Sequence, residues 1–362
     1  MNGDASKPEV LGLLLMGMVV VGTLLSLITL VRAIRKEGSW FGGLTRLCPS
    51  RPRVGPFWTP IEAIMLVLGH QLLLGVVALF FACYLMVWPT RSLNRLFPTM
   101  GAEWAIPPDP LTGAVGIGIA SLAMIPIAVW YLHLRHRDAA DAVGLRFRRA
   151  DVSVALRWVG LLLPPVLLVS SVVNLLVTYR HDALTALGML DDPLAIAVLV
   201  FSVGVVTPVA EELLFRGVLQ GSLEYVLSVR HQMRTTGVSL AEAAARPVGR
   251  THVWRPTSVW PIVWTSVIFA LLHLGQGGAV VPLFLFSLGL GWVMRQTGSL
   301  LPSILLHATL NLFSLAVAIA APTMTDGEGP VPVRVDADPT TEVTPRSSAH
   351  SAAPPALDPA AG

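Results

Sequence analysis

Residues 194–224 read LAIAVLVFSVGVVTPVAEELLFRGVLQGSLE. A helix of about 20 apolar residues crosses the hydrocarbon of a bilayer, so this run is long enough to do so. Charge interrupts it near the middle, where Glu211 and Glu212 follow Pro208 and precede Arg216. A charged side chain at the bilayer centre costs about 3 kcal/mol on insertion scales, which marks it as a candidate for function. The stretch therefore predicts a membrane helix that carries chemistry.

The composition of the whole chain agrees with a membrane location. Of its 362 residues, 54% are apolar and 13% are charged, whereas about 25% are charged in an average globular protein. So few charges would not cover the surface of a soluble protein. This excludes a soluble enzyme, a disordered protein and a nucleic-acid binder, although the net charge is +3. The two cysteines, Cys48 and Cys83, are too few for a disulfide framework.

Eight apolar runs predict an all-α, polytopic membrane protein with about eight transmembrane helices. They lie at about 10–31, 62–88, 111–133, 155–178, 194–224, 258–274, 279–295 and 300–321. The first four runs make residues 1–193 an N-terminal membrane region, and the last four make residues 194–321 a second one. Residues 322–362 are rich in Pro, Ala, Ser and Thr, a composition that predicts a disordered tail.

The basic residues predict the orientation of these helices. Most of the 25 lysines and arginines fall in the loops after the first, third, fifth and seventh runs. Loops rich in Lys and Arg stay in the cytoplasm, so both termini are expected outside it. The basic cytoplasmic loops, above all 230–257, are expected to contact anionic lipid headgroups. The Ala-, Arg- and Pro-rich character suggests a high-GC bacterium and hence the bacterial cytoplasmic membrane.

The two glutamates of the fifth run differ in their expected surroundings. Glu212 and Arg216 are four residues apart on one helix face, in the order that favours an ion pair. Glu211 projects about 100° away from that face, and it has no partner nearby in the sequence. We therefore expect Glu212 and Arg216 to be structural and Glu211 to act as a general base. Pro208 is expected to kink the helix one turn earlier.

Two later runs carry histidines at helical spacing. Phe269 and His273 share a face at the end of the sixth run, as do His307 and Asn311 in the eighth. The sixth and seventh runs are short, so the tip of their hairpin is expected at the depth of Glu211. Together these groups supply a base, a proton carrier and donors for a developing oxyanion. The set predicts water-dependent hydrolysis of a carbonyl compound.

Other polar residues in the apolar runs are weaker candidates. Glu62, His70 and Gln71 lie in the second run and Asn174 in the fourth. We interpret them as packing or cavity-lining groups. The sequence contains no H-E-x-x-H zinc motif and no G-x-S-x-G serine elbow.

Three motifs in the late runs resemble those of the CPBP intramembrane proteases. This family includes CAAX prenyl protease 2 and bacteriocin-processing, lysostaphin-resistance-like and abortive-infection proteins. The motifs are Glu211-Glu212-x-x-x-Arg216, Phe269-x-x-x-His273 and His307-x-x-x-Asn311. The resemblance covers about 194–315, and residues 1–193 carry no motif of the family. It implies an eight-span helical fold with a cavity open to the membrane and the cytoplasm.

The resemblance also implies a role for each motif residue in an intramembrane endopeptidase. Glu211 would activate water together with His273, while His307 and Asn311 would stabilise the oxyanion of the tetrahedral intermediate. The remaining motif residues would order the site: Glu212, Arg216 and Phe269. The expected substrate is a membrane-associated peptide or protein.

Metal dependence stays open from the sequence. If Zn²⁺ is bound, Glu211, His273 and His307 would be its ligands, as in a three-ligand catalytic site. Asn311 is a poor zinc ligand, however, and a buried Glu–His pair can activate water unaided. We therefore favour a reaction without a cofactor.

Two other readings of the sequence belong to different functional classes. The main alternative is a non-catalytic membrane protein of the same fold, acting as an immunity factor or a scaffold. A proton-coupled transporter would have inverted halves with broken helices in both. The first half has no counterpart to the glutamate-bearing run, so the transporter is disfavoured.

Overall fold

A computed structural model of the chain describes residues 7–52, 54–96, 110–177, 184, 187, 190, 192–244 and 256–320. The predicted tail at 322–362 lies outside these residues. So does the part of the basic segment 230–257 that runs from 245 to 255.

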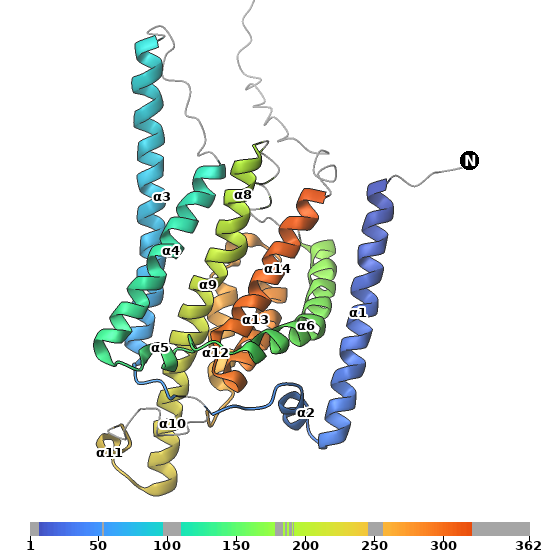
Figure 1. Ribbon diagram of the computed structural model, residues 1–362, viewed down its shortest axis with the longest axis vertical. Coiled ribbons are helices and arrows are strands. Elements are labelled where there is room, and N and C mark those ends of the chain that lie inside the picture. The colour runs from blue at the N-terminus through green and yellow to red at the C-terminus, as the bar shows by residue number, and fades with distance from the viewer. Residues whose placement is uncertain are drawn as a thin grey trace, which may run out of the picture. The chain divides into compact units, whose positions relative to one another are not determined.

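Residues 1–322 form one compact unit, and its described part is built from helices without a strand (Figure 1). Seven helices are long and apolar enough to cross a membrane, and an eighth apolar helix, α12 (Trp260–Leu271), is shorter. The seven are α1 (Lys7–Glu37), α3 (Pro60–Leu96), α4 (Pro110–Arg135), α6 (Arg149–Leu176), the continuous helix Pro193–Thr236, α13 (Val280–Thr297) and α14 (Leu300–Ala320). The all-α membrane fold with about eight such helices is confirmed.

Short helices join the long ones. They are α2 (Trp40–Leu47), α5 (Ala139–Ala142), α11 (Leu240–Ala244) and the 3₁₀ turn η3 (Leu274–Gln276). Three of the loops between them meet at one side of the unit. The Arg51 N–H after α2 donates to the Gln296 carbonyl near the end of α13, and the Leu300 N–H donates to the Gly144 carbonyl after α5. All three loops are among those predicted to be cytoplasmic. The side of the membrane on which they lie stays a prediction.

The outer helices carry apolar side chains on their surfaces. Leu72 of α3 and Leu156 of α6 are each 68% exposed, and Leu13 of α1 is 73% exposed. A water-soluble protein rarely leaves so much apolar surface uncovered, whereas lipid would cover it at no cost. The chain is therefore an integral membrane protein.

The helix Pro193–Thr236 lies at the centre of the unit, in contact with α4 and α14 (Figure 1). Its middle third is buried, and Leu213, Leu214 and Phe215 are each 2% exposed or less. These side chains pack in the largest hydrophobic cluster of the described residues, which also contains Phe269 of α12 and Leu300 of α14. Glu212, which directly precedes these three residues, is thus held inside a packed membrane core.

Candidate active site

The central helix changes its hydrogen-bond pattern twice around the two glutamates. It consists of α8 (Pro193–Phe201), the π-helical η1 (Ser202–Val206), α9 (Thr207–Glu212), the π-helical η2 (Leu213–Gln220) and α10 (Gly221–Thr236). Each π-turn accommodates one extra residue, and such turns often occur at functional sites. The disturbance expected at Pro208 is therefore a π-turn that ends two residues before the proline. It sets the direction in which Glu211 and Glu212 project.

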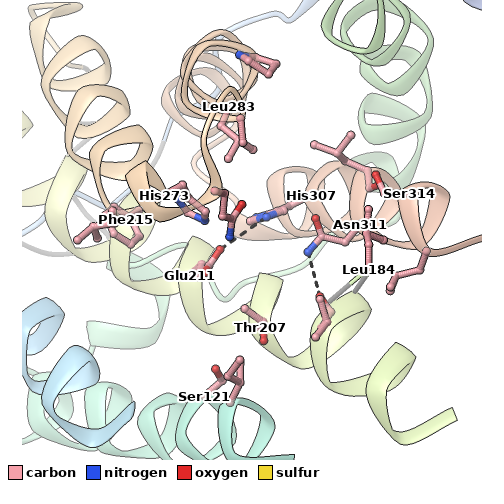
Figure 2. A pocket seen from close by; sticks show the side chains of 18 of the residues that line it. Ser121, Leu184, Thr207, Glu211, Phe215, His273, Leu283, His307, Asn311 and Ser314 are labelled. Atoms are coloured by element: carbon pink, nitrogen blue, oxygen red, sulfur yellow. Dashed lines mark hydrogen bonds and ion pairs between the residues drawn. The ribbon is translucent and has the colours of Figure 1, made fainter. Parts of the chain in front are cut away.

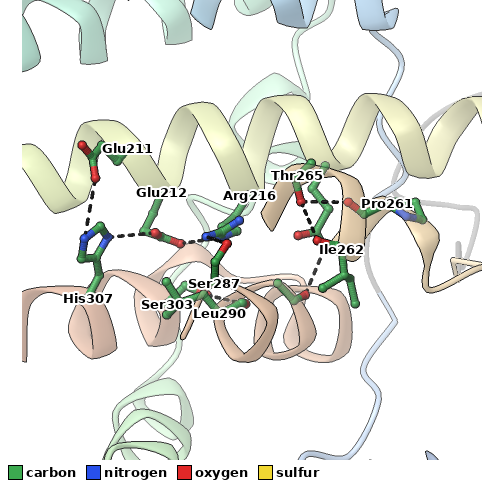
Figure 3. Close-up of polar contacts among 12 residues, drawn as sticks. Glu211, Glu212, Arg216, Pro261, Ile262, Thr265, Ser287, Leu290, Ser303 and His307 are labelled. Atoms are coloured by element: carbon green, nitrogen blue, oxygen red, sulfur yellow. Dashed lines mark hydrogen bonds and ion pairs between the residues drawn. The ribbon is translucent and has the colours of Figure 1, made fainter. Parts of the chain in front are cut away.

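Glu212 is fully buried and lies at the centre of a polar chain (Figure 3). Arg216 Nε donates to Glu212 Oε2 at 3.2 Å, which is the expected ion pair, and Arg216 Nη2 donates to Ser287 Oγ at 2.9 Å. The other carboxylate oxygen, Oε1, lies 3.0 Å from His307 Nδ1. A buried carboxylate needs such partners, because an uncompensated charge in the core is strongly destabilising. The sequence predicted the contact with Arg216 but not the one with His307.

Glu211 projects into a cavity instead of into the packed core. Its side chain is 17% exposed, and its Oε2 atom lies 3.6 Å from His307 Nε2. The imidazole of His307 therefore lies between the two glutamates, with one ring nitrogen toward each (Figure 3). Glu211 has no partner in its own helix, as expected, and it meets α14 instead.

His273 follows the end of α12, where the chain turns into η3. Its Nδ1 atom lies 2.7 Å from the Phe269 carbonyl oxygen. A carbonyl only accepts hydrogen bonds, so Nδ1 carries the proton and Nε2 of a neutral ring keeps its lone pair. The Phe269 ring is fully buried and contacts His273 and His307 at centroid distances of 4.7 and 5.8 Å. Phe269 thus orders both imidazoles.

Asn311 lies one turn after His307 on α14. Its Nδ2 atom donates to the Val203 carbonyl oxygen in η1 at 2.9 Å (Figure 2). An amide nitrogen carries two N–H bonds, so one remains for another acceptor. The amide is thereby fixed beside the cavity with a donor to spare.

One cavity brings the four expected catalytic side chains together. It measures about 310 Å³, the size of a small-molecule pocket. Glu211, His273, His307 and Asn311 all line it, from three separate parts of the chain (Figure 2). The α12–α13 hairpin does bring His273 to the cavity that holds Glu211, as expected, although only α12 is short and α13 is long enough to cross a membrane.

The N-terminal half supplies a second wall of the same cavity. His70 and Gln71 of α3 line it, together with Ser121 of α4. His70 and Gln71 were weak candidates in the sequence, and Ser121 was not a candidate, because an isolated serine in an apolar run carries no signal. Glu62 lies elsewhere, where it accepts hydrogen bonds from Thr59 and Tyr131 and pairs with Arg135. Asn174 is also not among the residues that line the cavity.

Glu211, His273 and His307 are the residues suggested as zinc ligands. Among the described residues, no group of three His, Cys, Asp or Glu side chains is arranged to hold a metal ion. Both nitrogens of His307 face glutamates, and Nδ1 of His273 is engaged by the Phe269 carbonyl, which leaves Nε2 of His273 toward the cavity. These contacts are compatible with metal binding as well as with a reaction without metal.

Comparison with known proteins agrees with the three motifs. Residues 193–313 match the family described as type II CAAX prenyl endopeptidase Rce1-like, which is consistent with the CPBP family. The match contains the four expected catalytic residues Glu211, His273, His307 and Asn311, whereas His70, Gln71 and Ser121 lie outside it. No curated protein and no solved structure matches the chain.

Proposed function

We propose that this chain, whose residues 193–313 form an Rce1-like domain, is an intramembrane endopeptidase. It would hydrolyse a peptide bond in a membrane-associated protein or peptide. The observation that carries the proposal is the convergence of Glu211, His273, His307 and Asn311 on one cavity inside a membrane protein. The family match supports proteolysis in general, and the cavity contains the groups that peptide hydrolysis requires.

Glu211 is the proposed general base. Its carboxylate faces the cavity, where a water molecule can reach it, while the neighbouring Glu212 is sealed in the core. In the first step Glu211 takes a proton from water, and the water oxygen attacks the carbonyl carbon of the peptide bond. His273 offers the Nε2 lone pair as an acceptor for the second water proton, which orients the nucleophile.

The oxyanion formed by this attack requires hydrogen-bond donors. Asn311 supplies the N–H that its bond to Val203 leaves free. His307 is the second proposed donor, through the Nε2–H that faces the cavity beside Glu211. Donors placed before the reaction stabilise the developing charge without reorganisation.

The second step returns the proton. Glu211 donates the proton that it took from water to the amide nitrogen, and the carbon–nitrogen bond then breaks. The products are a new carboxyl terminus and a new amino terminus, and Glu211 is again a carboxylate. No step requires a metal, so a chelator is expected to leave the rate of cleavage unchanged.

Terminal proteomics tests the proposed function. Membranes from host cells with the wild-type protein are compared with membranes from cells with Glu211→Gln at equal expression. New protein termini present only with the wild type are expected, and they would give the cut sites and the substrates. Identical termini in both samples would favour the non-catalytic immunity or scaffold reading.

A further inference from the structure

One backbone carbonyl beside the cavity has lost both of its helical donors. In an α-helix the Val203 carbonyl would accept from the N–H of Thr207, but that N–H bonds to the Ser202 carbonyl across the π-turn. In a π-helix Val203 would accept from residue 208, which is a proline without an N–H. A partly buried carbonyl inside a membrane helix needs a donor from outside its own helix when both helical donors are lost.

Asn311 of α14 is that donor. Its Nδ2 atom lies 2.9 Å from the Val203 oxygen. Because a carbonyl only accepts hydrogen bonds, this contact also decides which end of the amide faces the helix. The neighbouring Ser202 carbonyl is not available to Asn311, because it already accepts hydrogen bonds from the N–H and the hydroxyl of Thr207.

Gly204 allows α14 to approach this carbonyl. A Cβ atom at Gly204 would lie 2.5 Å from Leu312 Cδ2, closer than real side chains come. Leu312 directly follows Asn311, so the missing side chain of Gly204 permits the contact between η1 and this turn of α14. The π-turn, Gly204 and Pro208 thus leave one backbone carbonyl accessible to the amide side chain of Asn311.

We propose that Pro208 is a positioning residue for catalysis, which acts by keeping the Val203 carbonyl free to hold Asn311. Neither Pro208 nor Gly204 lines the cavity, so neither would touch the substrate. The proposal rests on the proposed function, in which the second N–H of Asn311 meets the oxyanion. Misplacing a catalytic group by about 1 Å can cost roughly 100-fold in rate. The hydrogen bond from Asn311 to the Val203 carbonyl is therefore expected to affect the rate of cleavage.

The test is a double-mutant cycle between Pro208→Ala and Asn311→Ala. It uses the purified full-length protein in lipid vesicles, with a peptide that spans a cut site found by terminal proteomics. Pro208→Ala restores an N–H that can bond to the helix carbonyls and compete with the amide of Asn311. We expect kcat to fall about 10- to 100-fold at an unchanged KM. In the Asn311→Ala background the same substitution is expected to lower kcat no further.

Controls separate positioning from folding and from the function itself. Pro126→Ala, within α4 and away from the cavity, is expected to leave kcat unchanged. A loss of folded protein would lower the rate equally in both backgrounds, and such an equal loss would overturn the proposal, as would a wild-type kcat for Pro208→Ala. Failure of the proposed function has a different signature, namely normal cleavage by Glu211→Gln measured in parallel.

Discussion

Two adjacent glutamates have different tasks because they face different surroundings. Glu212 has no exposure and both of its oxygens are bonded, to Arg216 and to His307. Glu211 is partly exposed in the cavity, and its Oε2 atom lies 3.6 Å from His307 Nε2. A group with saturated partners holds a structure in place, whereas a group with a free oxygen can accept a proton from water. Burial and bonding thus separate an ordering residue from a reacting one.

Glu212→Gln is expected to destabilise the protein more than Glu211→Gln does. The glutamine keeps the shape but leaves Arg216 without its counter-charge in a fully buried position. Removing one partner of a buried ion pair typically costs about 3–5 kcal/mol. Thermal unfolding of the purified variants in detergent measures the difference. Equal unfolding temperatures for the two variants would contradict the assignment of the structural role to Glu212.

Asn311→Ala is expected to lower kcat by about 10²–10³-fold, the usual loss when one oxyanion donor is removed. Asn174→Ala is the matched control, because Asn174 is an exposed asparagine of another long apolar helix and does not line the cavity. Steady-state cleavage of one peptide by both variants gives the comparison. Similar rates for the two variants would remove Asn311 from the oxyanion site.

At the scale of elements, the α12–α13 hairpin decides where His273 lies. α12 ends at Leu271, and the chain returns through η3 and Gly277, which has φ 64° and ψ −123°. Side chains other than hydrogen are strained at such dihedral angles. Residues 275–278 include three glycines, but only Gly277 has a positive φ. The turn therefore requires glycine at position 277.

Gly277→Ala is expected to displace His273 and to lower the rate of cleavage. A non-glycine residue in this backbone region is strained by about 1–3 kcal/mol, so the turn is expected to shift. Gly275→Ala is the control, because a Cβ atom there meets nothing within 4 Å and the residue has no positive φ. Cleavage rates of the two variants at equal amounts of folded protein test the idea, which equal rates would refute.

The sequence predicts contacts within an element better than contacts between elements. The Glu212–Arg216 pair follows from helical spacing, and the apolar runs predict the helices because both signals are local. The contacts of His307 with Glu212 and of Asn311 with Val203 join positions 95 and 108 residues apart. They depend on how α14 docks against the central helix. The π-turns also escape prediction, because an inserted residue leaves the apolar run unchanged, and only Pro208 hints at a disturbance.

At the scale of the whole molecule, the N-terminal half completes the site of the C-terminal half. α3 and α4 contribute His70, Gln71 and Ser121 to the cavity, although none of them lies in the stretch 193–313 that matches the Rce1-like family model. The sequence showed helices in this half but no motif, so its part in the cavity required the fold. The two halves are also joined by Asp151 of α6, which accepts a hydrogen bond from Ser299 Oγ at 2.8 Å and pairs with Arg51 of its own half.

The reactivity of the Cys48 thiol can be used to test how the helices pack. Its side chain is buried, and burial raises the pKa of the thiol to about 12, against the opposing effect of Arg51. The reactive thiolate is therefore scarce in the folded protein at pH 8. In a Cys83→Ser background we expect no maleimide labelling of Cys48 until the protein is unfolded. Rapid labelling of the folded protein at pH 8 would show that Cys48 is not packed as described.

The same pKa shift predicts how pH changes stability. The folded state holds the Cys48 proton more tightly than the unfolded state, whose thiol has a pKa near its ordinary value of 9.0. The contribution of this thiol to the free energy of unfolding is therefore complete below about pH 9 and declines as the pH rises toward 12. Unfolding curves of the wild type and Cys48→Ala above pH 9 should converge.

The most direct test of the central claim measures single-turnover cleavage by Glu211→Gln. Purified protein in lipid vesicles is mixed with a peptide that spans a cut site, and Glu62→Gln serves as a control glutamate of a membrane helix outside the cavity. Loss of the general base is expected to slow cleavage at least about 10²-fold, while Glu62→Gln keeps the wild-type rate. Cleavage by Glu211→Gln at the wild-type rate would contradict the proposal that this carboxylate activates the water.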